Sequence, residues 1–72
     1  MKLYRNAINP GQWVAYAQGI GWVMFPDTEG GWRQRRRACG LDPVHLREVP
    51  VRLAAHAGMP QTAPFEPFPR AA

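Results

Sequence analysis

The first hydrophobic pattern in the chain is a pair of apolar segments joined by a glycine-containing turn. Residues 12–17 and residues 22–25 are rich in aromatic and β-branched side chains, which favour β-strands. Between them, Gly19 and Gly21 supply the positive φ angles that a tight connection needs. We therefore predict an antiparallel hairpin, preceded by a turn at residues 9–11. Because both segments are apolar on both faces, the hairpin is expected to be covered on both sides or wrapped into a small barrel.

Residues 32–38 are compatible with two structures. Arginine and alanine favour a short helix, which Gly40 would end. The polar loop before this segment has the length of a hairpin connection and favours a strand, which is the structure we predict. Alternation along that strand would place Trp32, Gln34, Arg36 and Ala38 on one face and Arg33, Arg35 and Arg37 on the other.

Pro50 divides the apolar pattern that follows. Inside one long helix it would cost about 3 kcal/mol, whereas the first position of a helix accepts proline readily. We therefore predict a strand over residues 45–49 and a short helix over residues 50–57, closed by Gly58. The Asp-Pro step at residues 42–43 indicates either a turn or a helix start capped by the aspartate.

The last part of the chain differs in composition. Residues 59–72 contain four prolines, which favour extended polyproline geometry over helix or central strand. Phe65 and Phe68 lie between these prolines and are candidate docking residues for a partner, for the domain's own surface or for another copy. We predict one small domain over residues 1–58 and an extended Pro/Phe-rich tail over residues 59–72.

These elements predict a mainly β fold, a small SH3-like barrel of about four to five strands with a short C-terminal helix. The alternative is a β-hairpin followed by two or three short helices. The 72 residues suffice for one domain, which at this size buries only about 60% of the surface of its unfolded chain. The single cysteine, Cys39, allows no internal disulfide and is expected to be a buried, inert thiol.

The distribution of charge adds a candidate binding surface. The net charge is +4, and the first 41 residues carry all of it, with six basic against two acidic side chains. Such a patch attracts phosphate backbones or acidic protein surfaces. The candidate contacts are Arg33, Arg35, Arg36 and Arg37 for phosphates, with Trp32 or Trp13 stacked on a base. The competing interpretation is a solvated charged face above tryptophans that belong to the core.

The residue types in the chain give little indication of an enzyme active site or a metal site. The chain has no serine, and nothing in its sequence places Cys39 beside His45 or His56 as a thiol–imidazole pair. The spacing of these three residues matches no common zinc motif. The apolar runs are too short for a membrane span or a secretion signal. We expect a cytoplasmic protein with no enzymatic activity, cofactor or metal and no membrane partner.

The hairpin resembles the opening of the RNA-polymerase-interacting domain of CarD-type regulators and transcription-repair coupling factors. The positions that carry this likeness are Gly11, Val14, Tyr16, Gly19, Ile20 and Gly21. Residues 46–51, which run into a Val-Pro step, are similar to the closing strand of that family's barrel. The likeness covers residues 10–53, with Gln12 and Gln18 in place of the family's usual acidic residue and histidine. It implies a five-stranded SH3-like or Tudor-like barrel that docks on RNA polymerase.

The function predicted from these observations is that of a small non-enzymatic binding module. It would contact nucleic acid or the transcription machinery through a basic Trp/Arg face. The alternative is an adaptor or inhibitor, of the kind that phages and mobile elements encode, which binds an acidic protein surface and can act as a homo-oligomer.

Overall fold

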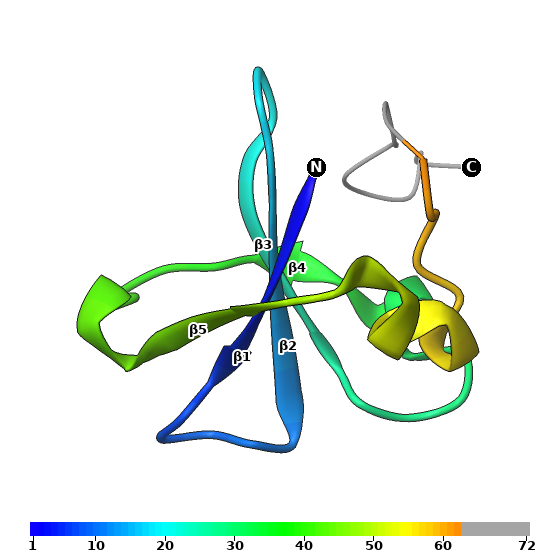
Figure 1. Cartoon of the computed structure of the whole chain (residues 1–72), viewed down its shortest axis with the longest axis horizontal. Helices are drawn as coiled ribbons and strands as arrows, with labels where there is room; N and C mark the ends of the chain where they lie inside the picture. Colours follow the sequence, from blue (N-terminus) through cyan, green and yellow to red (C-terminus); the bar gives the residue numbers. More distant parts are fainter. Residues whose placement is uncertain (63–72) are drawn as a thin grey trace.

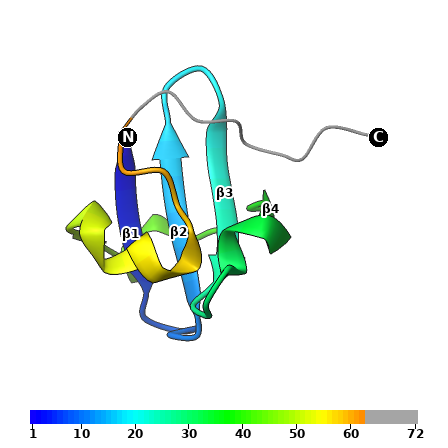
Figure 2. The same cartoon turned by 90° about the vertical axis from the view of Figure 1, so that its right-hand side faces the viewer.

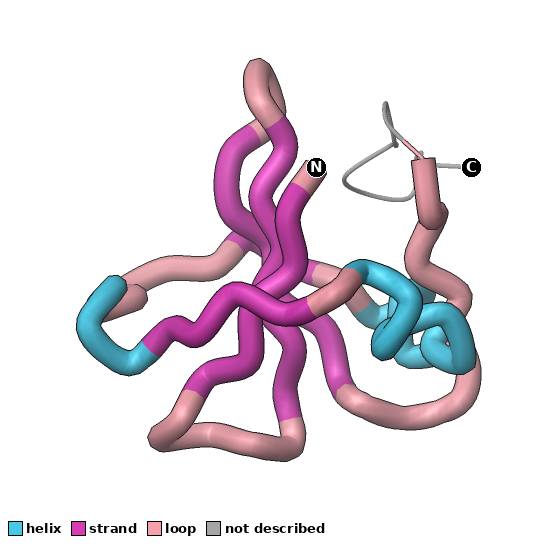
Figure 3. The backbone as a smooth tube through the Cα atoms, in the orientation of Figure 1, coloured by secondary structure: helices cyan, strands magenta, loops and turns pink. Residues whose placement is uncertain are grey.

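The structure is a computed structural model, and it describes residues 1–62 of the chain. In this part, five strands form one antiparallel sheet in the order β4-β3-β2-β1-β5. The strands are β1 (Lys2–Asn6), β2 (Gln12–Ala17), β3 (Gly21–Pro26), β4 (Arg36–Arg37) and β5 (Leu46–Val49) (Figure 1). The short 3-10 helices are η1 (Gly31–Gln34), η2 (Pro43–His45) and η3 (Val51–Ala57) (Figure 3). The predicted fold class, a mainly β fold of the small SH3-like type, is confirmed.

The predicted hairpin is present as β2 and β3. Its register runs from Gln12 opposite Pro26 to Ala17 opposite Gly21. Gly19 has a φ of 85° and Gly21 a φ of 97°, the left-handed region that other residues avoid. The backbone of this turn therefore requires glycine at the two positions from which the sequence predicted it.

Strand β1 was missed by the sequence analysis. It pairs with β2 on one side and with β5 on the other, so it connects β5 to the hairpin. Leu3 is fully buried, whereas its neighbours Lys2 and Tyr4 lie on the opposite face. Leu3 is the one apolar residue that β1 buries, and a single such residue gives too little alternation to indicate a strand.

The segment 32–38 is only partly a strand, and the prediction that it is extended throughout is wrong. Gly30, with a φ of 72°, turns the chain into η1, and β4 contains only Arg36 and Arg37. The cause is Trp32, which is buried and packs edge-on against Phe25 with ring centroids 4.9 Å apart. Burial of a large indole stabilises this turn more than local propensity favours either regular structure.

The C-terminal elements agree with the predictions in position. Asp42 caps η2 by accepting a hydrogen bond from the amide of Val44 at 3.1 Å, with Pro43 in the first turn. Strand β5 follows at Leu46, one residue later than predicted. After Pro50, η3 runs to Ala57 and is closed by Gly58 at a φ of 88°.

The main core lies between one face of the sheet and η3, which crosses β1 and β2 (Figure 2). In a 3-10 helix, residues three apart share a face, so Val51, Ala54 and Ala57 all point to this core. Their small size lets η3 pack close to the sheet. Met59, which the composition placed at the start of the tail, is also buried here. Phe65 and Phe68 lie outside the described residues.

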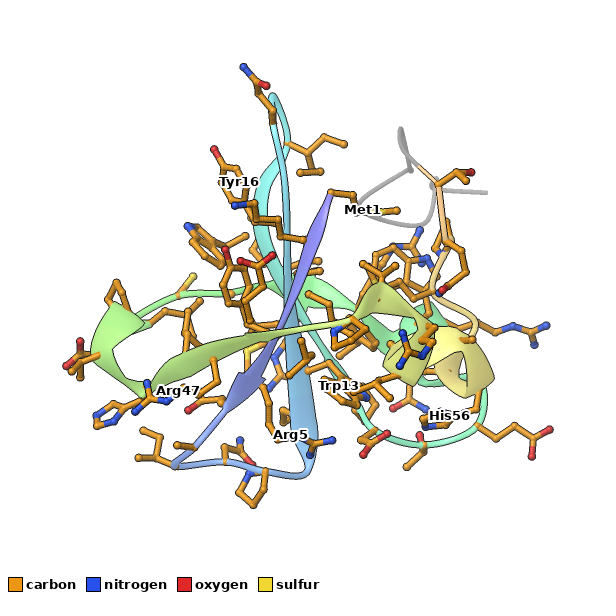
Figure 4. All side chains as sticks on the ribbon, viewed as in Figure 1. Met1, Arg5, Trp13, Tyr16, Arg47 and His56 are labelled. Atoms are coloured by element: carbon orange, nitrogen blue, oxygen red, sulfur yellow. The ribbon has the colours of Figure 1, made fainter. Side chains whose placement is uncertain are left out.

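A carboxylate connects the sheet to η3. Asp27, just after β3, accepts a hydrogen bond from the indole Nε1 of Trp13 at 2.8 Å. The same oxygen lies 2.7 Å from Nε2 of His56 on η3. Trp13 and His56 are both on the side of the sheet that η3 covers (Figure 4). Asp27 thus satisfies the indole donor and anchors η3 to the hairpin.

Replacement of Asp27 by alanine is expected to lower the free energy of unfolding by about 1–3 kcal/mol, because the indole donor of Trp13 loses its acceptor. Asp27→Asn keeps an acceptor oxygen and is expected to lose clearly less. Urea unfolding of both variants and the parent measures the two values. Equal stability of the alanine variant and the parent contradicts the role of Asp27 as an anchor.

Candidate functional site

The arginine run does not form the one-faced ladder that a strand would give. Arg35 turns back on η1, where its guanidinium carbon lies 4.7 Å from the centroid of the Trp32 ring. Its Nη1 donates to the carbonyl oxygen of Trp32 at 2.9 Å. Arg33, Arg36 and Arg37 are exposed. Arg35 therefore helps to hold the turn, and three arginines remain at the surface.

The two arginines of β4 project from opposite faces of the sheet. Arg37 is opposite Val23, which is fully buried in the main core, and Arg36 is opposite Met24 on the other face. Neighbouring residues of a strand point to opposite faces, so the two cations cannot serve one flat surface. The prediction that Arg36 shares a face with Trp32 is wrong, because Trp32 belongs to η1 and its ring packs into the main core.

Neither Trp13 nor Trp32 can stack on a base in this structure. Trp13 is 1% exposed and Trp32 is 7% exposed, and both belong to the main core. The guanidinium of Arg5 also lies 4.1 Å from the ring centroid of Trp13 and covers its open side. The interpretation of these tryptophans as core residues holds, and the prediction of a stacking role for them is wrong.

A different set of aromatic residues lies at the surface. We call Tyr4, Tyr16 and Trp22 the aromatic cluster. The ring of Trp22 lies 5.3 Å from that of Tyr4 and 4.9 Å from that of Tyr16, centroid to centroid, with tilted planes. Tyr16 is 36% exposed, and the other two are partly exposed. Trp22 is the least buried of the three tryptophans.

The aromatic cluster lies on the face of the sheet opposite to η3. The register places Tyr4, Val14 and Met24 in one row across β1, β2 and β3, and Tyr16 and Trp22 in the next row. Val14, in the middle of this face, is fully buried. Figure 4 shows Tyr16 on the side away from Trp13 and His56. Sequence reasoning missed this site because it requires the pairing of β1 with β2.

Two cations border the aromatic cluster. Lys2 is directly opposite Tyr16, and Arg36 extends the row of Met24 on β4. At the other end of that row, Glu48 on β5 lies opposite Tyr4 and forms an ion pair with Lys2 at 3.9 Å. Both partners of this pair are more than half exposed, so the pair contributes little to stability. Positive charge therefore dominates the β4 side of this face.

Two exposed arginines have no acidic partner within residues 1–62. The ion pairs within residues 1–62 include those of Lys2 with Glu48, of His45 with Asp42 and of His56 with Asp27. Arg33 and Arg36 form no ion pair with any residue of this part of the chain. Exposed guanidinium groups without internal neutralisation leave a positive potential that favours anionic partners.

The described residues form neither a cluster of metal ligands nor an enclosed pocket. Cys39 is exposed, so the expectation of a buried thiol is wrong. Within the described residues, no three histidine, cysteine or acidic side chains gather as metal ligands, and no pocket is enclosed. In the same range, no helix is long and apolar enough to cross a membrane. What the described chain offers to a partner is an open surface.

The fold and these surfaces define a small SH3-like β domain with exposed arginines and one partly exposed aromatic face. Comparison of the chain with protein-family models, with curated proteins and with solved structures found no match.

Proposed function

We propose that this protein is a nucleic-acid-binding domain that holds the phosphate backbone with the exposed arginines of η1 and β4. The observation that carries the proposal is the exposure of Arg33 and Arg36 without an ion pair inside residues 1–62. Guanidinium groups match the geometry of phosphate oxygens, and release of counterions from the nucleic acid supplies the affinity. Arg37, exposed on the other face of β4, extends the positive surface around the sheet edge.

Charge reversal tests this proposal with a matched control. Arg36→Glu is expected to weaken binding of a labelled DNA oligonucleotide roughly tenfold at low salt, and to reduce the slope of log K against log[salt] by about 1. Arg52→Glu makes the same change in net charge on η3, away from β4, and is expected to have a much smaller effect. Fluorescence anisotropy measures both. Equal losses for the two variants would show that only net charge matters and would reject the arginine surface as the site.

Docking on RNA polymerase is the alternative that the family resemblance implies. In this structure Gly19 and Gly21 serve the β2–β3 turn, and the Val49–Pro50 step ends β5 before η3. These residues are thus accounted for by the fold, which hosts many functions. A nuclease-treated pull-down separates the two functions, because capture of polymerase without nucleic acid would favour the docking function.

A further inference from the structure

The aromatic cluster is a candidate site of its own. One face of the sheet is covered by η3 (Figures 1 and 2). The register places the cluster on the opposite face. Val14, which lies between Tyr4 and Met24 in the register of this face, is fully buried. Burial of this valine does not explain why Tyr16 remains 36% exposed or why two cations flank the cluster. Partly exposed rings of this kind offer π-faces and edges to a planar ligand.

The arrangement across the strands suggests how a ligand would lie. Lys2 on β1, Tyr16 on β2 and Trp22 on β3 are neighbours in one row of the sheet. Arg36 on β4 continues the surface beyond β3. A chain that crosses the strands from β1 to β4 meets Lys2 with its exposed ion-pair partner Glu48, then two aromatic rings, and then Arg36 on the neighbouring row. Single-stranded nucleic acid alternates the same features, since each nucleotide joins a planar base to a phosphate.

We infer that the aromatic cluster stacks unpaired bases of single-stranded nucleic acid, while Lys2 and Arg36 hold the flanking phosphates. This inference rests on the proposed function and names its substrate class and a second surface for it. Bases inside a duplex present only their edges in the grooves, so this surface selects single strands. Tyr16, the most exposed ring, is expected to make the largest contribution that does not also disturb the fold.

A polyproline segment is the other ligand that suits a row of tyrosine and tryptophan rings. The chain contains a proline-rich sequence at residues 63–72, which carries Glu66 and Arg70 and therefore no net charge. The cations beside the cluster would gain nothing from such a neutral segment. Charge complementarity therefore favours the single strand over the polyproline segment.

The test compares two oligonucleotides of about ten nucleotides, one with thymine bases and one abasic but otherwise identical. The strand with bases is expected to bind roughly 5- to 100-fold more tightly, the effect of stacking one base on an aromatic ring. Tyr16→Ala is expected to remove most of this difference and to leave binding of the abasic strand unchanged. Tyr16→Phe, which keeps the ring, is expected to restore the preference. Leu53→Ala, an exposed apolar truncation on η3, is the control.

Each outcome separates the inference from the proposed function. Equal binding of the two strands, or equal loss of both in Tyr16→Ala, overturns the stacking inference and leaves backbone binding intact. Failure of both strands to bind overturns the two together. A synthetic peptide of residues 63–72 that quenches Trp22 fluorescence, where the thymine strand does not, assigns the cluster to the polyproline segment and rejects the inference. Trp22→Phe, compared with the parent, isolates the Trp22 signal.

Discussion

Replacement of Phe25 by alanine is expected to leave the protein largely unfolded. Phe25 is fully buried at the centre of the main core and packs edge-on against Trp32. Truncation of a buried phenylalanine costs about 3–5 kcal/mol, because apolar contact is lost and a cavity remains. A single core in a domain of this size rarely supplies more than about 3–5 kcal/mol in total. The substitution therefore removes nearly all of the expected stability.

Near-ultraviolet circular dichroism and urea unfolding measure this effect. The Phe25→Ala variant is expected to lack the tertiary signal of its buried tryptophans without denaturant. Val44→Ala removes an apolar side chain that is mostly exposed on η2, and it is expected to change stability by less than about 0.5 kcal/mol. A Phe25→Ala variant that unfolds at the urea concentration of the parent would contradict the assigned core.

Gly31→Ala is the second substitution with a large expected effect. A β-carbon at Gly31 would collide with the backbone carbonyl oxygen of Pro26, which is held by the end of β3 and cannot rotate away as a side chain would. The chain must shift at the start of η1, and this shift displaces Trp32 from the core. Such overpacking costs about 1–3 kcal/mol, and each kcal/mol lowers the Tm of a domain of this size by roughly 4–8 °C.

Gly11→Ala is the matched control for Gly31→Ala. A β-carbon at Gly11 meets no atom, and this glycine does not require a positive φ. We expect it to change stability by less than about 0.5 kcal/mol. Thermal unfolding of the two variants gives the comparison. Similar Tm values for both would contradict the close contact between η1 and the end of β3.

The sequence indicates those parts of the fold that depend on local geometry. Gly19 and Gly21 predict the hairpin because their positive φ angles are local requirements. Pro50 separates β5 from η3 for a similar reason, since proline restricts both itself and the residue before it. Local preferences do not predict the turn at Trp32, because its burial depends on tertiary packing with Phe25 and with the core that η3 completes. Tertiary packing there overrides the local preference for helix or strand.

The positive charge of the candidate site could be predicted from the sequence. The positions of its side chains on the two faces of the sheet could not. Exposed Arg33, Arg36 and Arg37 follow from composition, because charged side chains seldom lie in a core. Their distribution over two faces depends on the short β4, which pairs with β3 through only two residues. The aromatic cluster depends on the register of β1 against β2, which a strand with one deeply buried residue does not reveal.

Binding of single-stranded DNA by the unmodified protein over a series of salt concentrations tests the central claim most directly. The ligand is a fluorescently labelled oligonucleotide, and anisotropy gives the affinity. If Lys2 and the three exposed arginines contact phosphates, log K should fall linearly with log[salt] at a slope of about −2 to −3. No detectable binding at about 50 mM salt, or an affinity that does not change with salt, would contradict the account.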